Sequence, residues 1–175
     1  MTRVGHLVRR FRASVRPRPL AASDVAFVRD TLRPEELVCW ERLGPADRAE
    51  SVATGRALVA GLDAAGEKIE PRWVAAALLH DVGKAATGLG VIGRSVATVV
   101  ATVAGPRRAR TLPGAFGRYV NHDELGAETL RAAGARAEVV AWAAAHHRPA
   151  CWGVSGIPPR VCRVLAAADG EPSPE

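Results

Sequence analysis

Aromatic side chains are scarce in this chain of 175 residues, at 5% of the sequence. Proteins that bind single-stranded nucleic acid without sequence preference stack successive bases on aromatic side chains. The shortage therefore argues against a binding platform of that type. The chain is nevertheless basic, with a formal net charge of +6, and such a charge attracts phosphates and nucleic acid non-specifically. The net charge is thus the single argument for nucleic acid as a partner.

Cysteine and long apolar runs are also lacking. Cys39, Cys151 and Cys162 are too few and too widely spaced for a disulfide framework or a CxxC zinc site, so we expect buried or idle thiols. No apolar run reaches the roughly 18 residues that a membrane span requires. The N-terminus has no apolar segment of the signal-peptide type. These features predict a cytoplasmic protein without a membrane span.

The remaining composition is that of a globular protein, with 48% hydrophobic and 24% charged residues. The length suggests one domain with a substantial core. We expect a basic tail at residues 1–20, a single helical domain at 21–170 and a disordered tail at 171–175. The sequence does not indicate the oligomeric state.

Proline and glycine divide the domain into helical segments. Pro34, Pro45 and Pro71 each stand where the first residue of a helix is expected. The segment 91–105 is rich in valine and threonine and suits a helix or a strand, and its helical surroundings favour a helix. No segment shows the alternation of half-buried strands. The pattern predicts an all-α bundle. The expected helices cover residues 23–32, 34–43, 45–66, 71–81, 91–105, 121–134, 137–147 and 158–170.

Several residues look like helix caps. Ser23 and Asp24 are good N-caps for the first helix. Asn121 is the expected N-cap of a later helix, and Glu124 stands three residues after it, as in a capping box. Gly83 follows an apolar helix and can supply the left-handed residue that ends it.

Histidines and acids gather at predicted helix ends. The apolar run before His80 and Asp81 ends in this ionisable pair, and Asp169 similarly ends the last helix. Burying an unpaired charge costs several kcal/mol, so such a pair needs a partner. Imidazole nitrogen and carboxylate oxygen suit divalent ions such as Zn, Mn, Fe or Mg. A single pair is also typical of a buried ion pair, so the ordered set of histidines and acids carries the argument.

This ordered set resembles the HD-domain superfamily of metal-dependent phosphohydrolases. AALLHDVGK contains the HD dyad, HDELGAETL resembles the next conserved segment, and VLAAADG resembles the helix with the last aspartate ligand. HHRPACWGVSGIP resembles the paired-histidine segment of the HD-GYP branch, with Ile157 in place of the tyrosine of GYP. The resemblance covers residues 45–170 and implies an HD-domain-like helical bundle.

The resemblance also implies one or two bound divalent ions, Mn, Fe, Mg or Zn. Asp81 would be able to bridge two ions, and His147 would line or extend the second site. The implied ligands are His80, Asp81 and Asp169 for the first site, and His122, His146 and His147 for the second.

The resemblance further implies a substrate and a reaction. A metal-activated water would attack the phosphorus of a phosphomonoester or phosphodiester, with nucleotides as the commonest substrates in the family. Asp81 and Lys84 would be catalytic. Lys84 would contact the substrate phosphate as a point charge, with Arg94 and Arg118 as further contacts. Lys84 could instead be only a cation at a helix C-terminus.

One position departs from the family pattern. The family has a histidine on the helix before the HD dyad, where this chain has Glu50. Glu50 shares a stripe with Thr54, Ala57 and Gly61, a small-residue face that allows another helix to approach. A carboxylate is a competent ligand for Mn, Fe or Mg, but the substitution equally suits a degraded site. The alternative function is therefore a catalytically weakened HD module that binds a nucleotide or a protein partner without turnover.

Other charged residues have simpler interpretations. Asp123 and Glu124 lie in a first helical turn, where acids on the surface are favoured by the helix dipole. We expect one basic segment to be a solvated loop rather than a substrate clamp, and its arginines are Arg107, Arg108 and Arg110.

Overall fold

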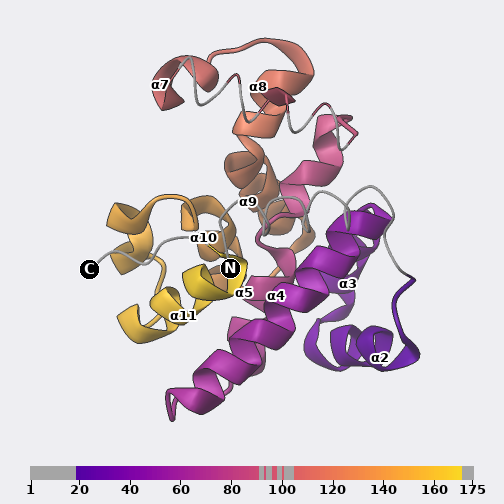
Figure 1. Ribbon diagram of the computed structural model, residues 1–175, viewed down its shortest axis with the longest axis vertical. Helices are drawn as coiled ribbons and strands as arrows, with labels where there is room; N and C mark the ends of the chain where they lie inside the picture. The colour runs from indigo at the N-terminus through magenta and orange to yellow at the C-terminus, as the bar shows by residue number, and fades with distance from the viewer. Residues whose placement is uncertain (1–18, 91–92, 94–95, 98–99, 101–104, 171–175) are drawn as a thin grey trace, which may run out of the picture.

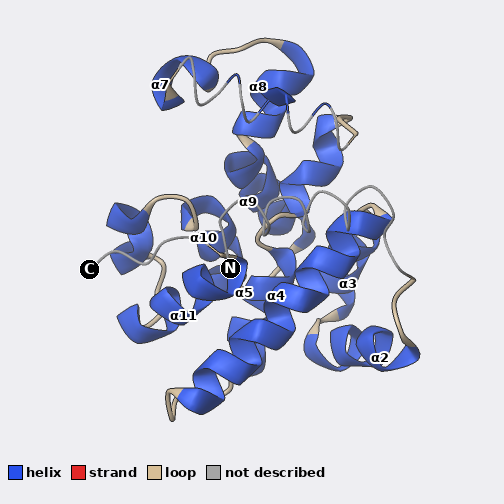
Figure 2. Cartoon of the chain, viewed as in Figure 1, coloured by secondary structure: helices blue, strands red, loops and turns tan. Residues whose placement is uncertain are grey.

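The structure is a computed structural model that describes residues 19–90, 93, 96–97, 100 and 105–170, and every regular element in these ranges is a helix (Figure 2). The predicted all-α fold is confirmed. The expected helix at 91–105 lies mostly outside the described residues. The α-helices are α2 (Ala22–Thr31), α3 (Pro34–Glu41), α4 (Pro45–Ala64), α5 (Pro71–Leu79), α7 (Pro106–Ala109), α8 (Gly114–Val120), α9 (His122–Ala133), α10 (Ala137–Ala145) and α11 (Pro159–Asp169). Two short 3-10 helices are η1 (Val82–Thr87) and η2 (Pro149–Val154).

The helix α5 is the centre of the bundle. Every residue from Trp73 to Leu79 is buried, and α2, α3, α4, α10 and α11 all pack against this helix. Figure 1 shows α2 and α3 on one side of α4, α10 and α11 on the other, and α7 and α8 projecting beyond α9. The cysteines are free thiols, and Cys39 and Cys162 are buried in the core. Within the described ranges, no helix has the length and apolar character needed to cross a membrane.

The helix starts predicted from proline are confirmed. Pro34, Pro45 and Pro71 are the first residues of α3, α4 and α5. A proline suits this position because the first N–H groups of a helix have no partner inside the helix, and its fixed φ already matches the helical value.

The caps predicted for the first helix are wrong. The helix α2 begins at Ala22, with Ala21 as the N-cap residue, so Ser23 and Asp24 lie inside the first turn. The Asp24 carboxylate instead accepts a hydrogen bond from Arg56 of α4 at 3.2 Å. A tertiary ion pair has therefore replaced the local capping bond that the sequence suggested.

The capping box predicted at the start of α9 is also wrong. Asn121 is the N-cap residue, but its side chain makes no capping hydrogen bond. Its amide instead donates to the backbone carbonyls of Arg110 and Gly117, at 2.9 Å in each case. The side chain thus joins the start of α9 to the segment before it.

The prediction that Gly83 ends α5 in a left-handed conformation is wrong. This residue lies inside η1, and the left-handed residue is Gly88, with a φ of 68°. Gly83 is needed for a different reason. A Cβ atom at this position would lie 1.9 Å from the carbonyl oxygen of His122 and 2.6 Å from the backbone nitrogen of Gly126. The backbones of η1 and α9 therefore cross in direct contact.

The small-residue stripe on α4 is only partly formed. A Cβ at Gly61 would lie 2.7 Å from a methyl group of Val164, so α11 does approach α4 closely at this point. Thr54 is buried, whereas Ala57 is exposed and Glu50 is half-buried. The stripe thus contacts α11 at one end and reaches Glu50 at the other.

A buried ion pair joins α3 to the start of α10. The fully buried carboxylate of Glu36 accepts hydrogen bonds from the backbone N–H groups of Arg33 and Arg136, at 3.0 and 3.1 Å. The Arg136 guanidinium also donates to it, from Nε at 2.9 Å and from Nη2. Burial alone would raise the pKa of Glu36, but these hydrogen bonds outweigh burial and lower it.

Replacing Glu36 by glutamine is expected to lower the free energy of unfolding by about 3 kcal/mol at neutral pH, because Arg136 would lose its buried counter-ion. The Glu36 pKa is lowered on folding, so its stabilisation is present above the ordinary value of 4.5 and is lost as the pH falls below that value. Urea unfolding of both proteins from pH 7 to pH 3 should show their difference shrinking below pH 4.5. A difference that is independent of pH would contradict the ion pair.

Gly83→Ala is expected to destabilise the protein by about 3 kcal/mol, because the added methyl group has no space and backbone must move. The matched control is Gly90→Ala, since a Cβ at Gly90 meets no atom within 4 Å and its φ is not positive. That variant should unfold within about 0.5 kcal/mol of the wild type. Equal effects of both substitutions in urea denaturation would rule out the backbone crossing.

Candidate metal centre

Three buried histidines stand at the ends of helices and make the same hydrogen bond. His80 directly follows α5, His146 directly follows α10, and His122 comes two residues after the end of α8. In each ring, Nδ1 lies within hydrogen-bond distance of the carbonyl oxygen three residues earlier. These carbonyls belong to Ala77, Tyr119 and Ala143, at 2.8, 2.7 and 2.9 Å from the rings of His80, His122 and His146 respectively.

This hydrogen bond determines which nitrogen of each ring is protonated. A carbonyl oxygen can only accept, so Nδ1 must be the protonated nitrogen, and Nε2 of the neutral ring keeps its lone pair. The last carbonyls of a helix have no partner within the helix, so the bond also satisfies the helix end. Hydrogen bonds of this kind orient the imidazole rings that bind metals.

The carboxylate of Asp81 lies among the three Nε2 atoms. Its Oδ1 atom is 3.0 Å from Nε2 of His122 and 3.8 Å from Nε2 of His146. Its Oδ2 atom is 3.3 Å from Nε2 of His80 and also pairs with the ammonium group of Lys84. One oxygen of Asp81 therefore faces two histidines, and the other faces the third.

The potential ligands form two groups, and within each group the ligand atoms all lie within 4.8 Å of one another. In the first group, Oδ1 of Asp169, the last residue of α11, is 3.1 Å from Nε2 of His80. Each group has three potential ligands, which could hold one ion. The first consists of His80, Asp81 and Asp169, and the second of His122, His146 and His147.

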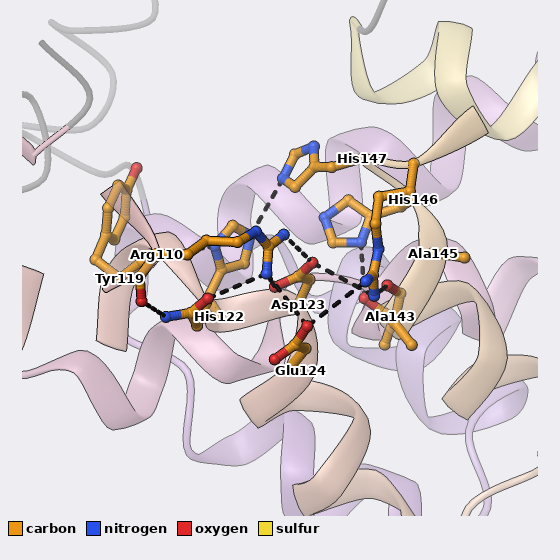
Figure 3. Close-up of polar contacts among 12 residues, drawn as sticks. Arg110, Tyr119, His122, Asp123, Glu124, Ala143, Ala145, His146 and His147 are labelled. Carbon is orange, nitrogen blue, oxygen red and sulfur yellow. Dashed lines mark hydrogen bonds and ion pairs between the residues drawn. The ribbon is translucent and has the colours of Figure 1, made fainter. Parts of the chain in front are cut away.

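His147 is the exposed member of the second group. Figure 3 shows its ring above those of His122 and His146. Its Nε2 atom is 3.3 Å from Nε2 of His122, and its ring centroid is 3.9 Å from that of His146. Two imidazole nitrogens at this separation repel each other through their lone pairs unless a proton or a cation lies between them.

Burial and the neighbouring charges shift the pKa values in different directions. Burial lowers the pKa of His80, but Asp81 and Asp169 outweigh it, so the net shift is upward. Burial alone would raise the pKa of both carboxyls, and their cationic neighbours lower it, chiefly Lys84 for Asp81 and His80 for Asp169. Burial, with the charge of His80, lowers the pKa of His146 to about 3. The His146 ring is therefore neutral at physiological pH.

Two buried polar atoms of the site make no hydrogen bond. They are Nε2 of His146 and Oδ1 of Asp81, which are 3.8 Å apart. Leaving a buried donor or acceptor unsatisfied costs about 1–3 kcal/mol, so native proteins rarely do so without a reason. A divalent ion that accepts both lone pairs would remove this cost, and the nitrogen and oxygen donors suit such an ion. The residues present therefore fit a metal.

Helix ends add to the attraction for a cation. The C-termini of α5, α10 and α11 lie at the ligand groups, because His80, His146 and Asp169 stand at or just after them, whereas His122 lies between the C-terminus of α8 and the N-terminus of α9. Each helix C-terminus carries roughly half a negative charge. The start of α9 carries the opposite partial charge and offsets the end of α8, so the ends of α5, α10 and α11 are those that favour a positive ion at the same place as the carboxylates.

Lys84 and Glu50 lie beside the first group. The largely buried ammonium of Lys84 pairs with Asp81. Burial alone would lower the pKa of Lys84, but the charges of Asp81 and Glu50 outweigh burial and raise it. Glu50 is thus close enough to act on Lys84, although it belongs to neither ligand group. Lys84 is more than a cation at a helix end, because its charge is directed into the site.

Of the two arginines expected at the substrate, the structure describes Arg118. Arg118 is exposed on α8, and among the described residues no ion pair or hydrogen bond joins it to either group. The predicted contact of Arg94 lies outside the described residues.

The structure differs most from the sequence prediction at Asp123. This residue was expected on the surface, but it is fully buried and forms an ion pair with Arg110 at 2.7 Å, whereas Glu124 is exposed as expected. Burial alone would raise the pKa of Asp123, and the hydrogen bond from Arg110 outweighs it and lowers the pKa. Arg110 is therefore neither a solvated loop residue nor a substrate clamp. The carbonyl partner of His122 could have been found from the sequence, because Tyr119 stands three residues before that histidine.

In protein treated with chelator, NMR correlation of ring nitrogens with ring protons should show His146 as the neutral tautomer protonated at Nδ1 at pH 7. The reason is the hydrogen bond to the Ala143 carbonyl at 2.9 Å. Urea-unfolded protein is the control, because its histidines should show mainly the Nε2-protonated tautomer that free imidazole side chains prefer. Protonation at Nε2 in the folded protein would contradict the proposed orientation of this ligand.

The HD domain family model matches residues 51–170, which include both ligand groups and Lys84. Glu50 lies immediately before the matched region. Comparison with curated proteins and with solved structures finds no match. The closer likeness to the HD-GYP branch stays a prediction. The family match covers most of the chain and agrees with the all-helical fold and the order of the ligands, so this chain belongs to the HD domain family.

Proposed function

We propose that this protein is a divalent-metal-dependent phosphohydrolase that cleaves a phosphomonoester or a phosphodiester, with nucleotides as the expected substrate class. The observation that carries the proposal is the position of Asp81. Its two oxygens face different ligand groups, His122 and His146 on one side and His80 on the other. This is the arrangement expected of a carboxylate that is shared by two ions.

The two groups offer different donors. The first has one imidazole nitrogen and two carboxylates, from His80, Asp81 and Asp169, and this set suits Mn, Fe or Mg. The second has three imidazole nitrogens, which suit Zn, Fe or Mn. When bound, such ions lower the pKa of a coordinated water to about 7 and withdraw charge from phosphoryl oxygens.

Lys84 provides a fixed positive charge for the substrate. Its pKa is raised, so the side chain stays protonated throughout the physiological range. The ammonium lies against Oδ2 of Asp81, at the edge of the first group. A phosphate oxygen brought to that edge would gain a charge-assisted hydrogen bond, and such a preorganised donor stabilises charge that develops in a transition state. We propose Asp81 and Lys84 as the catalytic pair, with Arg94 and Arg118 as further phosphate contacts.

One observation favours the alternative, an HD module without turnover. Glu50 occupies the position where the family has a histidine, and it lies outside both ligand groups. The first group therefore has one imidazole ligand, and Glu50 acts on Lys84 through its charge. A protein of this kind would bind a nucleotide or a protein partner without turnover and would release no phosphate.

The test measures metal content and hydrolysis on the same preparations. Protein purified without chelator is expected to contain about one or two transition-metal equivalents per chain. With Mn added, it should hydrolyse at least one substrate in a panel of phosphomonoesters and phosphodiesters. Asp81→Asn should reduce that activity by more than about 100-fold. Loss of a hydrogen bond that only orients a metal ligand already costs about 10–100-fold, and Asp81 would itself be a ligand of both ions. Asp63→Asn, at an exposed position on α4, is the matched control and should retain full activity.

The outcomes separate the two functions. No metal in the wild type, even after incubation with Mn or Fe, would refute the metal centre. Metal without hydrolysis of any substrate in the panel would favour the binding module. Activity that is equal in wild type and Asp81→Asn would show that the reaction occurs elsewhere or comes from a contaminant.

A further inference from the structure

A cluster of charged side chains lies against the second ligand group, and it comes from three segments of the chain. Figure 3 shows the guanidinium of Arg110 beside His122, with dashed lines to the carboxylates of Asp123 and Glu124. We call this set the ionic clamp. Its members are Arg110 after α7, Asp123 and Glu124 in the first turn of α9, and Arg148 after α10.

Arg110 holds the chain on both sides of His122. Its Nη2 atom lies 2.7 Å from Oδ2 of Asp123, and its Nη1 atom lies 3.4 Å from Oδ1, which is a fork-to-fork geometry. The same Nη1 atom also donates to Oδ1 of Asn121 at 3.0 Å and lies 3.3 Å from Oε1 of Glu124. The residues that flank His122 are therefore fixed by one guanidinium.

Arg148 connects the same two acids to the paired histidines. It directly follows His147, and its Nη2 and Nη1 atoms lie 3.7 and 3.5 Å from Asp123 and Glu124. Its guanidinium also donates to the backbone carbonyl of Ala144. The acids at the start of α9 thus contact the turn that ends α10.

The second group needs this connection because its ligands come from different helix ends. His122 stands at the junction of α8 and α9, whereas His146 and His147 follow α10. Metal affinity depends on holding ligand atoms within roughly 0.5 Å of the productive geometry. The helices α9 and α10 pack against each other, and the ion pairs of Arg148 join the start of α9 to the turn after α10.

We infer that Asp123 and Arg110 are positioning residues for the second metal ion, through their hold on the chain around His122. The inference rests on the proposed function, since it requires that the second group binds metal. Asp123 is not a ligand, because its carboxylate is engaged by Arg110 and it belongs to neither ligand group. The first group shares no residue with the clamp and meets His122 only through Oδ1 of Asp81, so its ion should depend on the clamp much less than the second ion does.

The experiment is a calorimetric titration of the chelator-treated full chain with Mn²⁺. Wild type should show two binding events, which Asp169→Asn and His146→Gln assign to the first and second group by removing one each. Asp123→Asn should weaken the second event by about 10–100-fold, as for hydrogen bonds that orient a ligand, and weaken the first event much less. Arg110→Met should do the same, and Asp123→Asn is the variant that tolerates substitution better, because the arginine that it leaves without a counter-ion is partly exposed. Glu128→Gln, at an exposed position on α9, is the matched control.

The results distinguish the possibilities. An unchanged second event in a folded Asp123→Asn or Arg110→Met protein would overturn the inference. So would an equal weakening of both events together with a lower unfolding temperature, because that pattern indicates a purely structural role. A wild type that binds a single ion at the first group would overturn the inference and leave the proposed function standing. A wild type that binds no ion would refute the proposed function itself.

Discussion

The hydrogen bond from a histidine Nδ1 to the carbonyl three residues earlier is the interaction on which the rest of the site depends. It occurs at His80, His122 and His146, each time at or near the end of a helix. The bond satisfies a carbonyl that the helix leaves without a partner, and it directs Nε2 towards the ligand groups, where the unprotonated nitrogen can bind an ion. One hydrogen bond therefore both satisfies the end of the helix and orients the ligand. The three rings are as rigid as the helices that carry them.

The same arrangement is costly in the absence of a cation. Carboxylates, imidazoles and helix C-termini of the same polarity converge in a buried space, and Nε2 of His146 and Oδ1 of Asp81 make no hydrogen bond there. Lys84 supplies part of the missing positive charge through its ion pair with Asp81. A ligand that binds only the folded state stabilises it in proportion to its affinity, so an ion in this site would stabilise the whole bundle.

Local signals in the sequence predicted much of the fold, and the resemblance to a known family predicted the residues that gather at the candidate site. Pro34, Pro45 and Pro71 mark helix starts because their effect acts within one turn. Gly83 and Asp123 were misinterpreted because their roles come from distant partners. Gly83 contacts the backbone of α9, and Asp123 is buried by an arginine from the preceding segment. A pattern along the chain predicts what a residue does to its own helix, but it does not reveal which segment will lie across it.

The backbone crossing at Gly83 has a consequence for the order of events during folding. Asp81 and His122 come together only when η1 meets α9, a contact that spans about forty residues of chain and costs closure entropy before it is formed. Such non-local contacts are slow to form. A partly folded chain would therefore contain all the histidines and aspartates and still lack the site, so that metal capture would report the completed native topology rather than the presence of the ligands.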